Sequence, residues 1–235
     1  MAWMGTLNMI AALIPMKDPI LSKQRLSGLL NPEERYGLAL AMFHDVIVAV
    51  RGASNVDRVV VYGSGGQIAE MARGVGCEFL EDPANEGETQ AVARATEILS
   101  PHFDGLLVIP ADVPLVRSED VDILVNESRM NPGVTLCPSR DRLGTNGVLR
   151  RPGGVMPLTF GSNSFYPHRA LAHRLGLPCM IVALPRLGLD IDRPEDVATF
   201  LSEAVDNETY RYLLSIGVKE RLDEMFLRIE PSPTS

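Results

Sequence analysis

Lysine is rare in this chain, and its placement is the first indication of chemistry. Of three lysines, Lys17 and Lys23 lie close together after the first apolar run, and Lys219 lies near the end of the chain. A loop that leaves the carboxyl edge of a parallel sheet is a common phosphate site, and lysine suits it as a mobile point charge. A solvated loop that binds nothing is the alternative, and these two lysines do not exclude it by themselves.

Three aspartates follow apolar runs that would bring them to the same edge. Asp112 comes just after the run at 105–110, and Asp190 and Asp192 stand two residues apart. In an extended segment such a pair projects to one face. Neighbouring carboxylates repel unless a cation neutralises them, and magnesium takes one or two carboxylates with substrate phosphates and water. An exposed turn, or an N-cap by Asp192 ahead of a helix, is the alternative; the nearby lysines favour a metal–phosphate site.

Two segments rich in glycine and hydroxyl residues could bind an anion. They are residues 144–147 (GTNG) and residues 160–165 (FGSNSF), and the second precedes a predicted helix. Small residues at a helix start expose backbone N–H groups, which suit an anion. Capping of that helix by Ser162, Asn163 or Ser164, with no ligand, is equally consistent with the pattern.

The remaining candidates are weaker. Residues 63–66 (GSGG) resemble a phosphate turn but lack the Walker or dinucleotide spacing, so we interpret them as a strand-to-helix turn. We interpret His44, His102, His168 and His173 as structural or surface residues. The sequence contains no Gly-x-Ser-x-Gly elbow, so it gives a hydrolase triad no support.

Composition limits the partners and the compartment. A net charge of −8 argues against a nucleic-acid or anionic-membrane surface, and 46% hydrophobic residues argue against disorder. The apolar run at 9–14 is too short to span a bilayer, so we expect a buried strand there. Cys77, Cys137 and Cys179 are odd in number and lack CxxC spacing, which predicts free thiols in a reducing compartment. We therefore expect a cytoplasmic protein.

Short apolar runs alternate with helical patterns, which predicts an α/β fold whose mainly parallel sheet carries helices on both faces. We expect one domain over residues 1–230, an active site at the carboxyl ends of the strands, and a disordered tail at 231–235. Helix starts are indicated by 31–34 (NPEE), 118–120 (SED) and 192–196 (DRPED), and Gly76 and Gly176 stand where helices should end. The predicted strands are 8–14, 57–62, 77–80, 105–110, 133–138, 147–150 and 178–184, and the predicted helices are 32–51, 66–75, 87–99, 118–129, 164–175, 194–204 and 207–227.

Taken in order, several of these segments resemble one known family, the 2-phospho-L-lactate guanylyltransferases. The start of the chain is similar to the family at 14–17 (IPMK), 22–26 (SKQRL) and 31–35 (NPEER). Later segments that are similar, in the family's order, are 109–115 (IPADVPL), 144–146 (GTN), 160–165 (FGSNSF) and 189–196 (LDIDRPED). The resemblance spans residues 10–204, most of the chain.

The resemblance implies a single-domain, GT-A-like nucleotide-diphospho-sugar transferase architecture, which is related to the Rossmann fold. It implies a magnesium-dependent enzyme that transfers GMP from GTP to the phosphate of a small phospho-acid and releases pyrophosphate, in coenzyme F-420 biosynthesis. The acceptor would be 2-phospholactate, phosphoenolpyruvate or 3-phosphoglycerate. Because an acceptor phosphate is already ionised at neutral pH, no general base is required, and positioning and charge neutralisation must do the work.

The resemblance also assigns roles to residues of this chain. The catalytic group would be Lys17, Lys23 and Asp112, and the magnesium ligands would be Asp112, Asp190 and Asp192. Lys17 and Lys23 would lie near the nucleotide's phosphates, and Thr145, Gly161 and Ser164 would contact the acceptor's carboxylate or phosphate. Beyond what the resemblance assigns, we expect Arg25, Gly87 and Glu88 to bind the nucleotide together with the two lysines.

One segment departs from the family pattern. Where the family usually has Gly-Leu-Asn-Ala-Ala-Leu, this chain has residues 87–92 (GETQAV). Glu88 could accept hydrogen bonds from guanine N1–H and N2–H₂, or it could be a first-turn helix acid that binds nothing. Both interpretations of Glu88, and therefore the base preference, stay open.

Two alternative functions also stay open. Sugar-phosphate and molybdopterin nucleotidyltransferases usually open with Leu-Ala-Gly-Gly, whereas this chain has residues 13–17 (LIPMK), which counts against them. A non-catalytic nucleotide-binding regulator on the same fold has its only support in the altered segment at 87–90. The predicted helix at 207–227 extends beyond the expected core, so it is a candidate element for a homodimer.

Overall fold

Strands from the whole length of the chain meet in one sheet. The computed structural model describes residues 9–16, 18–84, 86–128, 130–161 and 163–227. In this part of the chain the strand order is β3-β2-β1-β4-β6-β5-β7, and β6 is antiparallel to both β4 and β5 while the other pairings are parallel. Because β6 runs against its neighbours, its amino end lies at the edge where the parallel strands have their carboxyl ends.

The elements follow the alternation of short apolar runs and helical patterns. The strands are β1 (Ile10–Met16), β2 (Arg58–Gly63), β3 (Glu78–Glu81), β4 (Gly105–Val108), β5 (Gly133–Pro138), β6 (Thr145–Arg151) and β7 (Cys179–Ile181). The helices are α1 (Pro32–Arg51), α2 (Gly66–Gly74), α3 (Glu88–Leu99), α4 (Ser118–Glu127), α5 (Phe165–Arg174), α6 (Pro194–Ser202), α7 (Glu208–Ser215) and α8 (Val218–Leu227), with 3₁₀ turns at Pro19–Leu21 and Gln24–Leu26.

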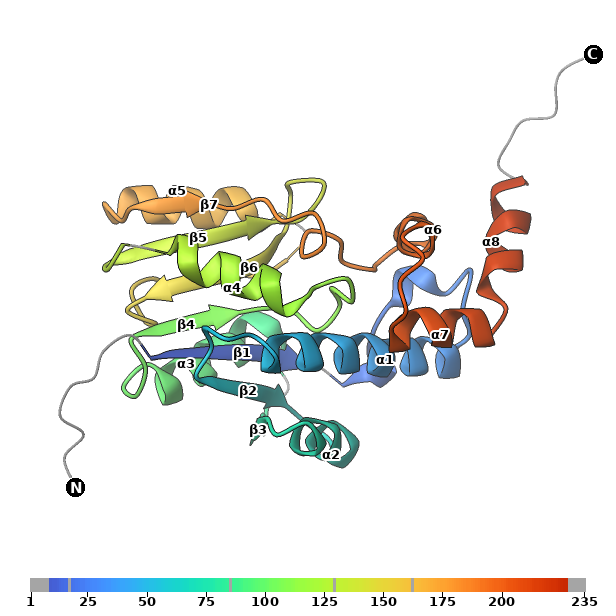
Figure 1. Cartoon of the computed structure of the whole chain (residues 1–235), viewed down its shortest axis with the longest axis horizontal. Coiled ribbons are helices and arrows are strands. Elements are labelled where there is room, and N and C mark those ends of the chain that lie inside the picture. The colour runs from blue at the N-terminus through green and yellow to red at the C-terminus, as the bar shows by residue number, and fades with distance from the viewer. Residues whose placement is uncertain (1–8, 17, 85, 129, 162, 228–235) are drawn as a thin grey trace, which may run out of the picture.

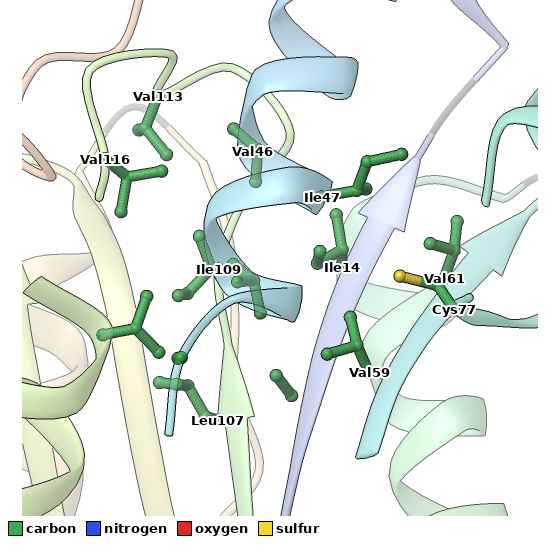
Figure 2. Packing of buried hydrophobic residues seen from close by; sticks show 14 of the residues in the cluster. Ile14, Val46, Ile47, Val59, Val61, Cys77, Leu107, Ile109, Val113 and Val116 are labelled. Carbon is green, nitrogen blue, oxygen red and sulfur yellow. The ribbon is translucent and has the colours of Figure 1, made fainter. Parts of the chain in front are cut away.

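Helices cover both faces of the sheet. One apolar cluster joins α1, α2 and α4 to side chains such as Ile14, Val61 and Leu107, and Figure 2 shows this packing. A second cluster joins α3 and α5 to the opposite side chains of the same strands, such as Leu13, Val60 and Leu106. Successive residues of a strand point to opposite faces, so the continuous apolar runs are explained by burial on both sides. The expected mainly parallel sheet with helices on both faces is confirmed (Figure 1).

A third apolar cluster lies beyond the ends of the strands. It joins the first half of α1 to α6, α7 and α8, which Figure 1 shows past the arrowheads of the sheet. Leu115, Leu189 and Ile191, from the loops that carry the three aspartates, belong to the same cluster. The helical tail therefore packs on α1 of its own chain and supports those loops from outside the sheet.

Local signals explain where several helices begin and end. Asn31 caps α1, with its side chain accepting from Glu34 N at 2.9 Å while the Glu34 carboxylate accepts from Asn31 N at 2.9 Å. This reciprocal capping box matches the predicted start at 31–34. Gly76 and Gly176 have φ values of +79° and +66°, the left-handed conformation that glycine adopts without strain.

The predicted boundaries differ from the structure in a few places. The helix predicted at 207–227 is wrong as one element, because Gly217 takes φ +64° and separates α7 from α8. The first strand continues through Pro15 to Met16, since the fixed φ of proline fits an extended strand. The strand predicted at 178–184 is shorter, Cys179–Ile181. The tail predicted to be disordered at 231–235 lies outside the described residues.

Two further expectations concern the surface and the thiols. No helix in the described ranges is long and apolar enough to cross a bilayer. Cys77, Cys137 and Cys179 are free thiols, the first two buried and the third half-buried.

Candidate active site

Lys23 lies at the centre of the charged residues at the carboxyl edge of the sheet. Its ammonium nitrogen is 2.7 Å from Asp112 Oδ2 and 2.8 Å from Asp192 Oδ1, and only 7% of its side chain is exposed. The backbone of Lys23 is left-handed, with φ +55° between the two 3₁₀ turns. A non-glycine residue in this conformation is uncommon and is often found at functional sites.

The position of the two aspartate segments explains this bridge. Asp112 follows β4, and Asp192 lies in the loop that leads to α6. The backbone N–H of Ile191 donates to the carbonyl of Asp112 at 3.0 Å and joins the two loops. The predicted meeting of Lys23, Asp112 and Asp192 at one edge is therefore confirmed.

Asp192 is not the cap of α6, which was the alternative interpretation of this residue. Arg193 is the N-cap, and the Asp196 carboxylate accepts from the backbone N–H groups of Asp192 and Arg193, at 3.1 and 2.9 Å. The Asp192 carboxylate instead faces Lys23 and, at 3.4 Å, Arg25.

The electrostatics of the cluster differ from one group to the next. The pKa of Asp190 is raised to about 6, first by burial and then by the negative charges of Asp112 and Asp192, while a hydrogen bond from Asn146 opposes the shift. Burial alone would raise the pKa of Asp192, but the positive charge of Lys23 holds it below its ordinary value. Burial alone would lower the pKa of Lys23, and the two carboxylates instead raise it above its ordinary value. The cluster therefore holds excess negative charge next to an ammonium group.

Asn146 holds Asp190 in place. Its side-chain amide nitrogen donates to Asp190 Oδ1 at 3.0 Å and to the carbonyl of Leu187 at 3.1 Å, and the residue is 5% exposed. Asn146 belongs to the segment at 144–147, but its sequence context predicts no separate role for it. An amide side chain next to a threonine is a weak signal, and only the fold brings it to the loop that carries Asp190.

The neighbouring residue Thr145 faces a different set of partners. Its hydroxyl oxygen lies 3.3 Å from Ser164 Oγ and 3.1 Å from His168 Nδ1, and all three residues are buried. Ser164 is the N-cap residue of α5 without a capping side-chain hydrogen bond. Thr145 and Ser164, both predicted to contact the acceptor, therefore lie next to each other, and His168, interpreted from the sequence as a structural or surface residue, lies against them.

A small hollow lies between the end of β1 and the start of α3. Gly87 and Glu88, at the start of α3, line it with Pro15 and Met16 from β1 and with Tyr62, Asp82 and Ala91. The backbone N–H of Phe160 donates to the Thr89 hydroxyl at 2.9 Å. That bond brings the start of α3 beside the segment that contains Gly161, so the predicted nucleotide and acceptor residues are neighbours. Gly161 itself is exposed.

The remaining predictions concern Lys17, Ser162 and a metal ion. Lys17 and Ser162 lie outside the described residues. Among the residues described, no group of three or more His, Cys, Asp and Glu side chains is arranged to hold a metal ion. A larger hollow of about 700 Å³ lies between α1, residues 114–119 and residues 203–208, and it contains none of the predicted site residues.

The chain is similar to one known protein family and to individual guanylyltransferases. A family model described as "Guanylyl transferase CofC like" matches residues 10–227. A phosphoenolpyruvate guanylyltransferase of Rubrobacter xylanophilus is 33% identical over 86% of this chain and 97% of its own length. A 2-phospho-L-lactate guanylyltransferase of Methanothermobacter thermautotrophicus is 32% identical over 94% and 98%. A 3-phospho-D-glycerate guanylyltransferase of Colwellia psychrerythraea is 34% identical over 83% and 93%.

Solved structures show the same fold at low sequence identity. A nucleotidyl transferase from Methanothermobacter has a TM-score of 0.65 and 16% identity over 83% of this chain and 97% of its own. A protein from Desulfovibrio desulfuricans, described as a nucleotide-diphospho-sugar transferase, has a TM-score of 0.75 and 13% identity over 93% and 98%. The expected nucleotide-diphospho-sugar transferase architecture is confirmed.

Proposed function

Because the chain belongs to the guanylyl transferase CofC-like family, we propose that it transfers GMP from GTP to the phosphate of a small phospho-acid and releases pyrophosphate. The observation that carries the proposal is the junction at the start of β6. There Thr145 faces the Ser164 hydroxyl while the next residue, Asn146, holds Asp190. A binding site for an anionic acceptor, at Thr145 and Ser164, would thus lie next to a carboxylate cluster that suits a cation. The family implies a place in coenzyme F-420 biosynthesis.

The acceptor belongs to a narrow class of phosphorylated carboxylic acids. Relatives that are 32–34% identical to this chain are named for phosphoenolpyruvate, 2-phospho-L-lactate and 3-phospho-D-glycerate. In our proposal the Thr145 and Ser164 hydroxyls and the backbone near Gly161 bind the acceptor's carboxylate or phosphate. Hydrogen bonds to an ionised group are stronger than neutral ones, so a few donors at this site can fix the orientation.

The chain's own residues then have to position two anions and neutralise them. The nucleophile is an oxygen of the acceptor phosphate, which is ionised at neutral pH, so the reaction requires no general base. Lys23, whose pKa lies above its ordinary value, carries its positive charge throughout the physiological range. We propose that Lys23, with Lys17 and Arg25, neutralises charge on the phosphates of GTP as pyrophosphate leaves.

Magnesium is the cation we propose for the carboxylates. The donor set fits it, because the groups are hard oxygens and the Lys23 ammonium already sits between Asp112 and Asp192 as a stand-in cation. Magnesium needs only one or two carboxylates when phosphates and water complete its shell, so a preformed trio of ligands is not required. Asp112, Asp190 and Asp192 would hold the ion, which would supply charge neutralisation at the phosphates.

We propose that the nucleotide base lies over the start of α3, beside Gly87 and Glu88. The backbone of Gly87 takes φ +102°, a value that favours glycine, immediately before α3 begins. A carboxylate such as that of Glu88 can accept from guanine N1–H and N2–H₂, which adenine and the pyrimidines do not match in the same way.

GTP is a cytoplasmic nucleotide and the three cysteines are free thiols, so we propose a cytoplasmic location.

Pyrophosphate release tests the function directly. Purified protein with magnesium is given GTP, ATP, CTP or UTP, each paired with phosphoenolpyruvate, 2-phospholactate or 3-phosphoglycerate. We expect release only with GTP and with one favoured acid. Release with a different nucleotide would show that the segment at 87–90 has changed the base preference. Folded protein that releases pyrophosphate with no pair would favour the regulator on the same fold.

Replacing one carboxylate tests the site. Asp112→Asn keeps the shape of the side chain but removes its charge, and Asp223→Asn, on the exposed side of α8, is the matched control. We expect Asp112→Asn to reduce kcat/KM by about a hundredfold or more, because charge stabilisation at a transferred phosphoryl group is worth several kcal/mol. The control should keep normal turnover, and near-normal turnover in Asp112→Asn would remove Asp112 from the site.

A further inference from the structure

His168 is a buried histidine whose two ring nitrogens are both engaged. It lies in α5, 1% of its surface is exposed, and its Nε2 accepts a hydrogen bond from the backbone N–H of Thr159 at 3.1 Å. Its Nδ1 lies 3.1 Å from the hydroxyl oxygen of Thr145. The ring therefore connects the backbone ahead of α5 with the threonine at the start of β6.

The partner of Nε2 decides which nitrogen carries the proton. A backbone N–H can only donate, so Nε2 must offer its lone pair, and in a neutral imidazole the proton then sits on Nδ1. Burial, together with the positive charge of Arg150, lowers the pKa of His168 to about 4, so the ring is neutral at physiological pH. It follows that Nδ1–H donates to Thr145.

This direction has a consequence for the threonine hydroxyl. The other tautomer would accept the hydroxyl proton of Thr145 and turn it toward the ring. With Nδ1–H as the donor, the Thr145 oxygen accepts from the ring and its own proton must point elsewhere. The Ser164 hydroxyl, at 3.3 Å, donates to the same Thr145 oxygen and so does not take up this proton. The proton of Thr145 is therefore available to an incoming anion.

We propose that His168 is a positioning residue that sets the Thr145 hydroxyl as a hydrogen-bond donor to the anionic acceptor. This inference rests on the proposed function, in which Thr145 contacts the phospho-acid. His168 does not touch the acceptor; it acts through Thr145. A neutral ring that is already hydrogen-bonded keeps this orientation before the substrate arrives, so little ordering is left for the binding step.

The simpler alternative is that His168 only fills the core. It packs edge-on against Phe160, with ring centroids 5.6 Å apart, and it satisfies the N–H of Thr159. Both contacts are structural and would be disturbed by many substitutions. A test must therefore remove the donor to Thr145 and the acceptor for Thr159 separately.

Two amide substitutions make that separation. Glutamine reaches the place of Nε2, so His168→Gln can accept from Thr159 but loses the donor to Thr145. Asparagine reaches the place of Nδ1, so His168→Asn can donate to Thr145 but leaves Thr159 without its partner. Kinetics are measured with phosphoenolpyruvate, 2-phospholactate and 3-phosphoglycerate, and binding of each acid to the protein is measured by calorimetry. Thermal melting reports whether each variant is folded.

We expect His168→Gln to raise the KM and the Kd for the acceptor about tenfold or more, which is the worth of a hydrogen bond to a charged group. The KM for GTP should not change. The acceptor KM of His168→Asn should stay within about threefold of the wild-type value. Both variants should melt at a lower temperature than the wild type, because they lack the ring. Equal acceptor KM values in the two variants would overturn the inference.

A Thr145→Val background gives a second test. The valine has no hydroxyl to orient, so His168→Gln should add little to the loss that Thr145→Val already causes. A full additive loss would mean that His168 acts on the core and not on Thr145. In the wild-type protein, ¹⁵N NMR of the imidazole should find the proton on Nδ1, and a proton on Nε2 would overturn the inference even if a variant failed to fold.

The measurements distinguish a failure of the proposed role of His168 from a failure of the proposed guanylyltransferase function. A wild type that turns over, with His168→Gln indistinguishable from it, removes the role of His168 and leaves the function intact. A wild type that binds a phospho-acid without turnover, and loses that binding in His168→Gln, removes the transferase proposal and keeps the role of His168. A wild type that neither binds nor uses any of the three acids overturns both.

Discussion

The ammonium group of Lys23 and the cation proposed for this site compete for the same carboxylates. Lys23 is almost wholly buried and bonded to both Asp112 and Asp192, so in this structure it neutralises the charge that magnesium would neutralise. A phosphate ligand would offer the ammonium group a new partner and leave the carboxylates to the metal. The residue can therefore stabilise the site before substrate binds and serve the phosphates afterwards.

Lys23→Met tests this competition. Methionine keeps much of the length of the side chain but has no charge, and Lys219→Met, on the exposed side of α8, is the control. We expect the variant to bind Mn²⁺, a probe for magnesium, about tenfold more tightly in the absence of nucleotide, because two carboxylates lose their internal cation. Without metal the variant should melt at a lower temperature than the control, and Mn²⁺ should restore much of the loss. Unchanged or weaker Mn²⁺ binding would show that Lys23 and the metal do not share these carboxylates.

Element boundaries are set by single residues as much as by long patterns. The turn between α7 and α8 depends on Gly217, whose φ of +64° is costly for any residue with a Cβ atom. By contrast, Gly74 ends α2 without a positive φ, and a Cβ atom added there would meet nothing within 4 Å. The two glycines therefore have opposite tolerance for alanine.

Gly217→Ala should destabilise the protein by about 1–2 kcal/mol, the cost of holding a side-chain-bearing residue in the left-handed region. Gly74→Ala should be neutral or stabilise it by up to about 1 kcal/mol, because alanine restricts the unfolded chain at a position it can adopt. Urea unfolding of both variants measures the free energy of unfolding. A Gly217→Ala variant as stable as the wild type would mean that the α7–α8 turn relaxes into a continuous helix, as the sequence pattern at 207–227 indicates.

Most of the fold followed from periodicity, while parts of the site did not. The runs at 57–62, 105–110 and 133–138 coincide closely with β2, β4 and β5, because apolar runs bounded by turn residues leave few other possibilities. A lone glycine inside a helical pattern is tolerated often enough that the break at Gly217 could not be predicted. The predicted Lys23 and aspartate cluster formed because parallel strands end at one edge. Asn146 and His168 could not be assigned, since their roles depend on partners more than twenty residues away.

At the scale of the whole molecule, the helical tail is part of the support for the active site. Asp45 of α1 accepts the backbone N–H groups of Glu208 and Thr209, at 2.9 and 2.8 Å, at the start of α7. The Tyr212 hydroxyl donates to the carbonyl of Glu34 at 3.0 Å. The apolar cluster that joins α6, α7 and α8 to α1 also contains Leu189 and Ile191, on either side of Asp190. Loosening the tail should therefore loosen the loop that holds this aspartate.

Two leucines near the end of α7 allow this intrachain role to be distinguished from a role in a homodimer. Leu213 is fully buried in the cluster with α1, whereas Leu214, the next residue, is 47% exposed. We expect Leu213→Ala to lower the free energy of unfolding by about 2–5 kcal/mol, as is usual for a large-to-small change in a core. Leu214→Ala should change it by less than about 0.5 kcal/mol. Chemical unfolding at two protein concentrations, with light scattering for the mass, measures both effects. If Leu214→Ala is strongly destabilising at low concentration and reduces the mass of the native protein, the exposed face of α7 is a subunit interface. If only Leu213→Ala has an effect, α7 acts within its own chain, and a homodimer would need another surface.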